Sequence, residues 1–230
     1  MRLKEPANTF RYHSSLNPVA WDGLTLNPQV RLHLLRTARQ FIHYLDLPEL
    51  RITDVILVGS NANFNWNKYS DFDVHVVADF DTLNCNVAEA LFKAKKDLWN
   101  SQHDVTIRGF DVELYVQSVR EHVQSQGQFS LLDNQWLSQP THNQPDVDDH
   151  AVMAKTAELI YQIHQAVDND RSIDGIEHIQ DKIRRMRQSG LAAHGEFGVE
   201  NLAFKNLRNE GFLEKLSKAK TGIIDRQLSL

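Results

Sequence analysis

Hydrophobic positions in the first half of the chain follow two different periods, and each period predicts one kind of element. Apolar side chains recur every three or four residues in two segments, which predicts an amphipathic helix that begins at Asn27-Pro28 and another through residues 87–98. Shorter apolar or alternating runs predict strands. These runs are residues 51–58, 72–77 and 105–117. The resulting order of helix, strand, strand, helix, strand predicts an α+β sheet domain.

The second half of the chain is predicted to be helical. Helix-like spacing of apolar residues recurs around 152–167, 173–186 and 199–216. Residues 133–150 are rich in Pro, Asn and Asp, so this segment is the best candidate for a linker. We therefore expect three parts: an N-terminal extension over the surface (1–27), a sheet domain (28–140) and a C-terminal helical bundle (141–230). The bundle is expected to form a cleft with the sheet domain.

The turn after the first predicted strand carries the first candidate chemistry. The apolar run Val55-Ile-Leu-Val stops at Gly59-Ser60. Glycine lets the backbone approach a bulky anion, and exposed N–H groups in such a turn bind phosphate. Gly59 and Ser60 are therefore candidate phosphate-binding residues.

Carboxylates on the next two predicted strands are candidate metal ligands. Side chains alternate along a strand, so Asp71 and Asp73 share a face, and so do Asp111 and Glu113. Magnesium prefers hard oxygen ligands, and two ions about 3.5–4 Å apart support in-line phosphoryl displacement. A two-ion site of this kind needs a third acid beside Asp71 and Asp73. We select Glu113, which lies inside its apolar run, and Asp111 remains the alternative.

Gly59-Ser60, Asp71-x-Asp73 and a later acid on a strand together resemble the DNA polymerase β-like nucleotidyltransferase superfamily. More faintly, the segments Glu113-Leu-Tyr-Val-Gln, Phe129-Ser-Leu-Leu and Trp136-Leu-Ser-Gln-Pro are similar to small phage-type nucleotidyltransferases. The first resemblance covers roughly residues 30 to 117. It implies a nucleotidyltransferase-like mixed β-sheet with flanking helices, followed by a helical region.

The resemblance also implies an activity and a role for each matched residue. The enzyme would move a nucleoside monophosphate from a nucleoside triphosphate such as ATP to an acceptor hydroxyl, with two Mg²⁺ or Mn²⁺ ions. Gly59 and Ser60 would hold the terminal phosphates. Asp71, Asp73 and Glu113 would be the catalytic and metal-binding acids. The third acid of the superfamily is often aspartate, so Glu113 departs from that pattern.

Further candidates come from charge and from position on the strands. Lys68 is the one cation in the loop between Ser60 and Asp71, although a turn-forming role suits this asparagine-rich loop at least as well. Residues 181–220 hold nine Lys and Arg against five Asp and Glu. From these the candidate phosphate contacts are Lys182, Arg185, Lys205 and Arg208. His75 shares the face of the aspartates and is a candidate contact to the acceptor.

Composition limits the classes of protein that the chain fits. The net charge of −5 argues against a protein that coats nucleic acid by electrostatics alone. One cysteine excludes an internal disulfide and a cysteine zinc cluster. Apolar stretches are far shorter than the roughly 20 residues that cross a bilayer, and the first residues do not resemble a secretory signal. We therefore expect a cytoplasmic protein without a membrane partner.

Two other function classes remain open. One is a catalytically inactive module that keeps the nucleotidyltransferase fold and binds RNA or a partner protein. The other is a glycosyltransferase that uses Asp71 and Asp73 to hold the metal of a nucleotide sugar. No motif in the sequence indicates the acceptor of the leading hypothesis, which could be RNA or tRNA, a protein, or a small molecule. The preferred base and the oligomeric state have no motif either.

Overall fold

The computed structural model describes residues 12–83, 88–123, 125–142 and 146–229. They fall into two compact units, a sheet unit up to residue 142 and a helical unit from residue 146. Each unit is described by itself. The coarse prediction of an α+β chain with a mixed sheet and several helices is confirmed.

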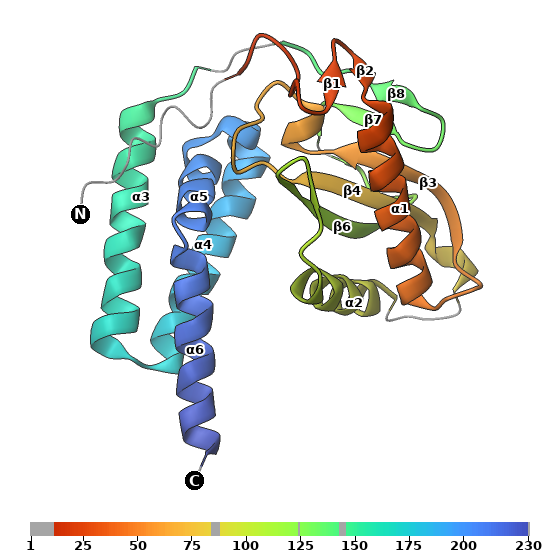
Figure 1. Cartoon of the computed structure of the whole chain (residues 1–230). Helices are drawn as coiled ribbons and strands as arrows, with labels where there is room; N and C mark the ends of the chain where they lie inside the picture. The colour runs from red at the N-terminus through yellow and green to blue at the C-terminus, as the bar shows by residue number, and fades with distance from the viewer. Residues whose placement is uncertain (1–11, 84–87, 124, 143–145, 230) are drawn as a thin grey trace. The chain divides into compact units, whose positions relative to one another are not determined.

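The sheet unit is built on one mixed sheet of six strands (Figure 1). The strands are β3 (Arg51–Val58), β4 (Phe72–Asp79), β5 (Thr106–Ile107), β6 (Phe110–Ser118), β7 (Gln128–Ser130) and β8 (Gln135–Ser138). They lie in the order β5-β6-β4-β3-β7-β8. Only β4 and β6 are parallel, while every other neighbouring pair is antiparallel. The strands β3, β4 and β6, which contain the three predicted runs, are therefore neighbours at the centre of the sheet.

Two helices cover one face of this sheet (Figure 1). Helix α1 (Pro28–Leu45) begins where Asn27 Oδ1 accepts hydrogen bonds from the N–H groups of residues 29 and 30, as expected for an Asn-Pro start. Helix α2 (Ala88–Gln102) packs on β6. On β4 the buried side chains alternate with half-buried ones, so one set faces the helices and the other set, which includes Asp73 and His75, faces away.

Residues 12–27 differ from the predicted surface extension, because they are part of the sheet unit. Leu16, Ala20 and Trp21 are buried in the same core as the sheet and α1. Strands β1 (Trp21–Asp22) and β2 (Thr25–Leu26) form a small hairpin there. The Trp21 ring stacks on Trp136 with their centroids 4.7 Å apart, which attaches the hairpin to β8. Long-range aromatic packing of this kind has no local sequence pattern.

The predicted linker and the predicted third strand also differ in detail. Strand β8 lies inside 133–150, so the sheet unit continues through most of that Pro- and Asn-rich segment. The run 105–117 is a hairpin of β5 and β6 rather than one strand. Its two turn residues, Arg108 and Gly109, both have positive φ, as a tight hairpin turn requires.

The helical unit contains four α-helices among its described residues. They are α3 (Asp149–His164), α4 (Ile173–His194), α5 (Val199–Asn209) and α6 (Phe212–Leu228). The single helix predicted over 199–216 is wrong, because Gly211 takes a left-handed conformation with φ 75° and separates α5 from α6. Leucine and isoleucine side chains from all four helices share one core. No helix in the described ranges is long and apolar enough to cross a membrane.

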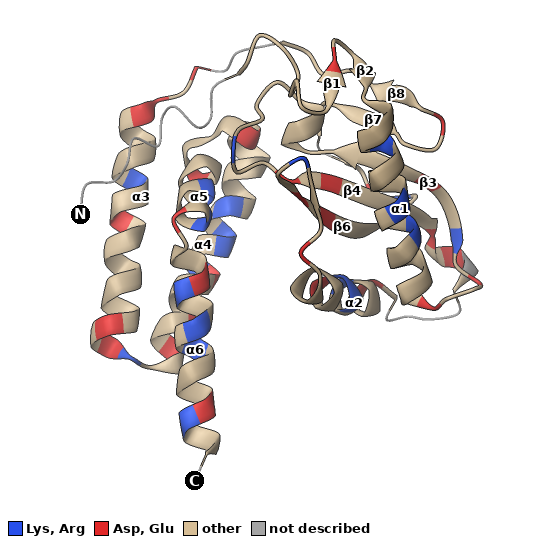
Figure 2. Ribbon diagram, in the orientation of Figure 1, with Lys and Arg blue, Asp and Glu red and all other residues tan. Residues whose placement is uncertain are grey.

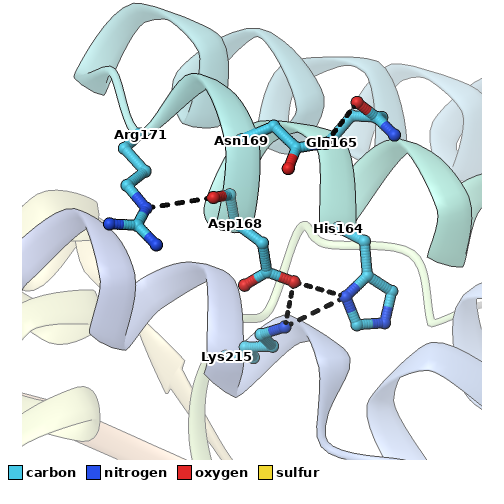
Figure 3. Close-up of polar contacts among 6 residues, drawn as sticks. All are labelled: His164, Gln165, Asp168, Asn169, Arg171 and Lys215. Carbon is cyan, nitrogen blue, oxygen red and sulfur yellow. Dashed lines mark hydrogen bonds and ion pairs between the residues drawn. The ribbon is translucent and has the colours of Figure 1, made fainter.

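A π-helical turn, η4 (Gln165–Asp170), follows α3 and is attached to α6 (Figure 3). Asp168 Oδ2 lies 2.6 Å from His164 Nδ1 and 3.1 Å from Lys215 Nζ. The hydrogen bonds from His164 and Lys215 lower the pKa of Asp168. Arg171 ends the turn with φ 51° and donates from Nε to the Asp168 carbonyl at 3.0 Å. These contacts fix the connection between α3 and α4.

Candidate functional site

The register of the central three strands places two of the predicted acids, Asp73 and Glu113, in adjacent positions. In the parallel pair of β4 and β6, Asp73 lies opposite Glu113. On its other side Asp73 lies opposite Val58, the last residue of β3. Neighbouring strands are about 4.8 Å apart, and residues in register point to the same face. Asp73 and Glu113 are therefore side by side on the face of the sheet that α1 and α2 leave uncovered.

Asp111 and Asp71 occupy the preceding positions on the same two strands. Asp111 lies two residues before Glu113 on β6 and pairs with Thr106 of β5. Asp71 lies just before β4, where Phe72 pairs with Val112. The register therefore places Glu113 next to Asp73, and it places Asp111 at the level of Asp71. Figure 2 shows the acidic positions on the adjacent ends of β4 and β6.

The turn at Gly59 is shaped around the Asp73 carboxylate. Gly59 has φ 71° and ψ −163°, a region of backbone conformation that is essentially restricted to glycine. A Cβ atom at Gly59 would lie 1.7 Å from Asp73 Oδ2. The close approach of an anion that the sequence predicts for Gly59 is thus made in this structure by the protein's own carboxylate.

Asparagine side chains fix the loop between Gly59 and Asp71. Asn61 is buried, and its Nδ2 donates to the Asp71 carbonyl at 2.9 Å. Its Oδ1 accepts from Asn17 Nδ2 at 2.7 Å, and its carbonyl accepts from Trp21 Nε1 at 2.7 Å. The position of Asp71 therefore depends on the residues before α1, and the asparagines have the structural role that the sequence left open.

A second set of hydrogen bonds connects Gly59 with the segment before β7. Asn63 Nδ2 donates to the Gly59 carbonyl at 2.6 Å, and Asn63 Oδ1 accepts from Gly127 N–H at 2.8 Å. Gly59 N–H donates to Ser125 Oγ at 3.2 Å. The N–H group that the sequence offers to phosphate is therefore bound to a serine hydroxyl. Sequence reasoning identified neither Ser125 nor Gly127, because more than 60 residues separate them from the loop.

Ser60 and Lys68 also have contacts within this loop. The Ser60 hydroxyl donates to Ser70 Oγ at 2.7 Å, which in turn accepts from Asn67 N–H at 2.8 Å. Lys68 is exposed, and its Nζ lies 4.7 Å from the centre of the Tyr69 ring. Ser60 begins the turn after Gly59, and Lys68 lies in the loop that follows. Their roles toward phosphate remain predictions.

The acidic side chains are not gathered into a metal site. Within the ranges that the structure describes, no three His, Cys, Asp or Glu side chains are grouped so that they could hold one metal ion. Asp71 and Asp73 are half-buried, whereas Glu113 is exposed. The strand positions and the carboxylate donors suit Mg²⁺ or Mn²⁺. The predicted two-ion site stays a prediction.

His75 lies next to the acids on the same face, but its Nδ1 is already occupied. It lies 2.8 Å from Gln117 Oε1, and Gln117 Nε2 donates to the Glu121 carbonyl at 3.3 Å. Burial lowers the pKa of His75 below its ordinary value of 6.5, although the Gln117 hydrogen bond opposes this effect. The lowered pKa favours the neutral form of His75, and the Gln117 contact fixes the orientation of its ring. Gln117 had no distinguishing signal in the sequence.

A cavity of about 770 Å³ opens at the far end of β6, beside α2. Tyr115, two residues after Glu113 on β6, lines this cavity. Its hydroxyl donates a hydrogen bond to Glu121 at 3.2 Å. Burial and then Glu121 raise the pKa of Tyr115. The other charged lining residues are Asp81, Glu89, Lys93, Lys96 and Arg120. Its volume lies in the range of small-molecule sites.

The predicted phosphate contacts in the helical unit lie on two helices. Lys182 Nζ donates to Gln162 Oε1 at 2.8 Å and lies 3.7 Å from Glu158, so its charge is partly neutralised. Arg185 lines the same shallow hollow on α4 as Lys182. Lys205 lies on α5. The residue that the sequence analysis missed is Arg187 of α4, which contacts α5 directly.

Comparison with protein-family models, with curated proteins and with solved structures gave no significant match.

Proposed function

We propose that the sheet unit is a metal-dependent nucleotidyltransferase, with a nucleotidyltransferase-like arrangement of its mixed sheet. The observation that carries this proposal is the register of β4 with β6, in which Asp73 lies beside Glu113 at the level of the Gly59 turn. Acidic side chains on neighbouring strands next to a glycine turn are suited to holding divalent ions and phosphate at one point.

Asp71, Asp73 and Glu113 would hold the ions, because carboxylates are the ligands that Mg²⁺ and Mn²⁺ prefer. Bound ions would neutralise the phosphate charge and stabilise the attacking and leaving oxygens. The chain's own contribution is positioning. Gly59 leaves room for the Asp73 carboxylate, and Asn61 fixes the backbone of Asp71.

In the proposed reaction an acceptor hydroxyl oxygen forms a bond to the α-phosphorus of a nucleoside triphosphate. The bond from that phosphorus to the oxygen leading to the β-phosphate breaks, and pyrophosphate leaves. Glu113 would orient the hydroxyl and accept its proton. The terminal phosphates would replace Ser125 Oγ at the Gly59 N–H and Ser70 Oγ at the Ser60 hydroxyl.

The test is transfer of label from nucleoside triphosphates labelled at the α-phosphate, with Mg²⁺ or Mn²⁺ and a panel of acceptors that includes RNA, the protein itself and small hydroxyl compounds. We expect the α-label to reach an acceptor, while a γ-label appears in pyrophosphate. Replacing Asp73 with asparagine should lower the rate at least about a hundredfold, since a metal contributes several kcal/mol of transition-state stabilisation. Asp79→Asn, at the other end of β4, is the matched control.

The same assay compares the two candidates for the third acid. Glu113→Gln should abolish transfer, and Asp111→Asn should retain most of it, because Glu113 is the register partner of Asp73. The opposite result would assign the role to Asp111. Two results together would refute the proposed nucleotidyltransferase activity. They are the absence of transfer to any acceptor, and nucleotide binding that is unchanged in Asp71→Asn and Asp73→Asn.

One observation favours a competing proposal: among the described residues, no three potential ligands are grouped around a possible metal position. The competing proposal is an inactive module that binds RNA or a partner protein. This module would bind its ligand equally well with and without divalent ions, which calorimetry measures directly. A glycosyltransferase would leave the labelled nucleoside triphosphates unchanged. It would release a labelled nucleoside diphosphate from a nucleotide sugar in a parallel assay, which distinguishes that reaction.

A further inference from the structure

Several cations of the helical unit are paired with a carboxylate. Six such ion pairs lie on or between the helices of this unit. They are Lys155–Glu158, Lys182–Glu158, Arg184–Asp181, Lys215–Asp168, Lys218–Glu214 and Lys220–Glu177. Such pairs are what a solvated helical surface normally shows. A half-buried cation that lies near another cation, with no acid to offset the two charges, needs a physical reason.

Arg187 of α4 is such a cation, and its guanidinium is held by neutral groups. Its centre lies 4.2 Å from the centre of the Phe204 ring on α5. Its Nε donates to Asn201 Oδ1 at 3.3 Å. Asn201 is buried and is itself fixed, because its Nδ2 donates to the Glu196 carbonyl at 2.7 Å. Stacking and one hydrogen bond thus orient a half-buried guanidinium and leave its terminal N–H groups for another partner.

Arg208 brings a second positive charge to the same place. It follows Phe204 by four residues on α5, so the two side chains lie on one face of the helix. Burial and then the charge of Arg208 lower the pKa of Arg187, and no carboxylate opposes these effects. Among the residues that the structure describes, neither arginine forms an ion pair. Figure 2 shows Lys and Arg gathered where α4 and α5 lie side by side.

We propose that Arg187 and Arg208 form a phosphate-binding site on the α4–α5 surface. The two guanidinium charges repel each other, and an oxyanion bound by both removes that repulsion. Arginine presents parallel N–H donors that match two oxygens of a phosphate, and the Phe204 stack fixes this geometry in advance. The ligand class is a phosphate group, carried either by a nucleoside triphosphate or by the backbone of a nucleic-acid acceptor. The proposal rests on the proposed function for its biological meaning.

The experiment measures phosphate binding without metal, so that the site is tested apart from catalysis. The full chain carrying Asp71→Asn and Asp73→Asn is titrated in EDTA with tripolyphosphate, with ATP and with a fluorescent single-stranded RNA. Arg208→Gln is the main variant, because Arg208 is exposed and its loss should not disturb folding. Arg187→Gln is the second variant. Arg184→Gln, which removes an equal charge from an ion pair on α4, is the matched control.

We expect each of Arg187→Gln and Arg208→Gln to weaken tripolyphosphate binding about tenfold, and Arg184→Gln to leave it unchanged. ATP affected more than RNA identifies a nucleotide as the source of the phosphate. RNA affected more than ATP, with a salt slope reduced by about 0.7 per arginine, identifies a single-stranded nucleic acid. Without phosphate, Arg208→Gln should raise the melting temperature, because it removes the repulsion.

Equal binding by all three variants would overturn the phosphate site, and so would a lower melting temperature in Arg208→Gln with binding unchanged. These outcomes are independent of the proposed function. Loss of label transfer to all acceptors, together with arginine-dependent binding, would refute the enzyme and leave the phosphate site in place. Label transfer and phosphate binding that both remain unchanged in Arg187→Gln and Arg208→Gln would support the enzyme and refute the phosphate site.

Discussion

Gly59→Ala is the substitution whose effect the structure defines best. The added methyl group would lie 1.7 Å from Asp73 Oδ2 and 2.6 Å from Asp73 Cγ, far inside any van der Waals contact. Asp73 must therefore leave its present rotamer or the turn must move. In addition, alanine is strained at φ 71° and ψ −163°, at a cost of about 1–3 kcal/mol. An off-rotamer Asp73 adds about 0.5–1.5 kcal/mol.

The structure provides a matched control for this substitution. Gly23 also has a positive φ of 57°, but a Cβ atom there would meet nothing within 4 Å. Gly23→Ala therefore tests backbone strain without a clash, at a cost of about 1–2 kcal/mol. We expect Gly59→Ala to lower the free energy of unfolding by about 2–4 kcal/mol, and to weaken metal-dependent nucleotide binding where Gly23→Ala does not.

Urea unfolding followed by tryptophan fluorescence is the appropriate assay. All four tryptophans of the chain, at positions 21, 66, 99 and 136, lie in the sheet unit, so the signal reports on that unit. A free energy of unfolding for Gly59→Ala equal to that of Gly23→Ala would show that the Asp73 carboxylate does not lie against the turn. That result would refute the geometry on which the candidate site is built.

Two further predictions concern the polar groups around the site. His75 has a lowered pKa in the folded state, so the unfolded chain binds more protons and stability should fall as the pH drops below about 6.5, by at most about 1.4 kcal/mol per pH unit from this group. Urea titrations at pH 7.5 and 5.5 should show a smaller pH dependence in His75→Gln, and an equal one would contradict the assignment. Asn63→Ala leaves the Gly59 carbonyl and the Gly127 N–H without their side-chain partner, so it should destabilise the sheet unit by about 2–4 kcal/mol in the same assay. A loss below about 0.5 kcal/mol would show that water replaces these hydrogen bonds without cost.

The elements with a strong local period were the ones that the sequence predicted well. The alternating run at 72–77 is strand β4, and the apolar run at 51–58 is strand β3. The Asn27-Pro28 signal marks the first residue of α1. In each case the same residues carry both the local preference and the burial, so the pattern and the structure agree.

The features that the sequence did not predict depend on distant contacts or on one backbone conformation. Strand β8 is held by Trp21 and by pairing with β7, and neither partner is visible in a window around 133–150. The break between α5 and α6 depends on the left-handed conformation of Gly211, which helical periodicity passes over. The position of Glu113 beside Asp73 follows from the parallel register, which no spacing within one strand specifies.

The proposed two-ion site is tested most directly by electron paramagnetic resonance of Mn²⁺ bound to the chain in the presence of a non-hydrolysable nucleoside triphosphate. We expect two bound Mn²⁺ ions per chain, about 3.5–4 Å apart and therefore magnetically coupled, with binding lost in Asp73→Asn and retained in Asp79→Asn. Binding of Mn²⁺ that is the same in Asp73→Asn as in the unmodified chain, or that involves no carboxylate of β4 or β6, would contradict the proposed site.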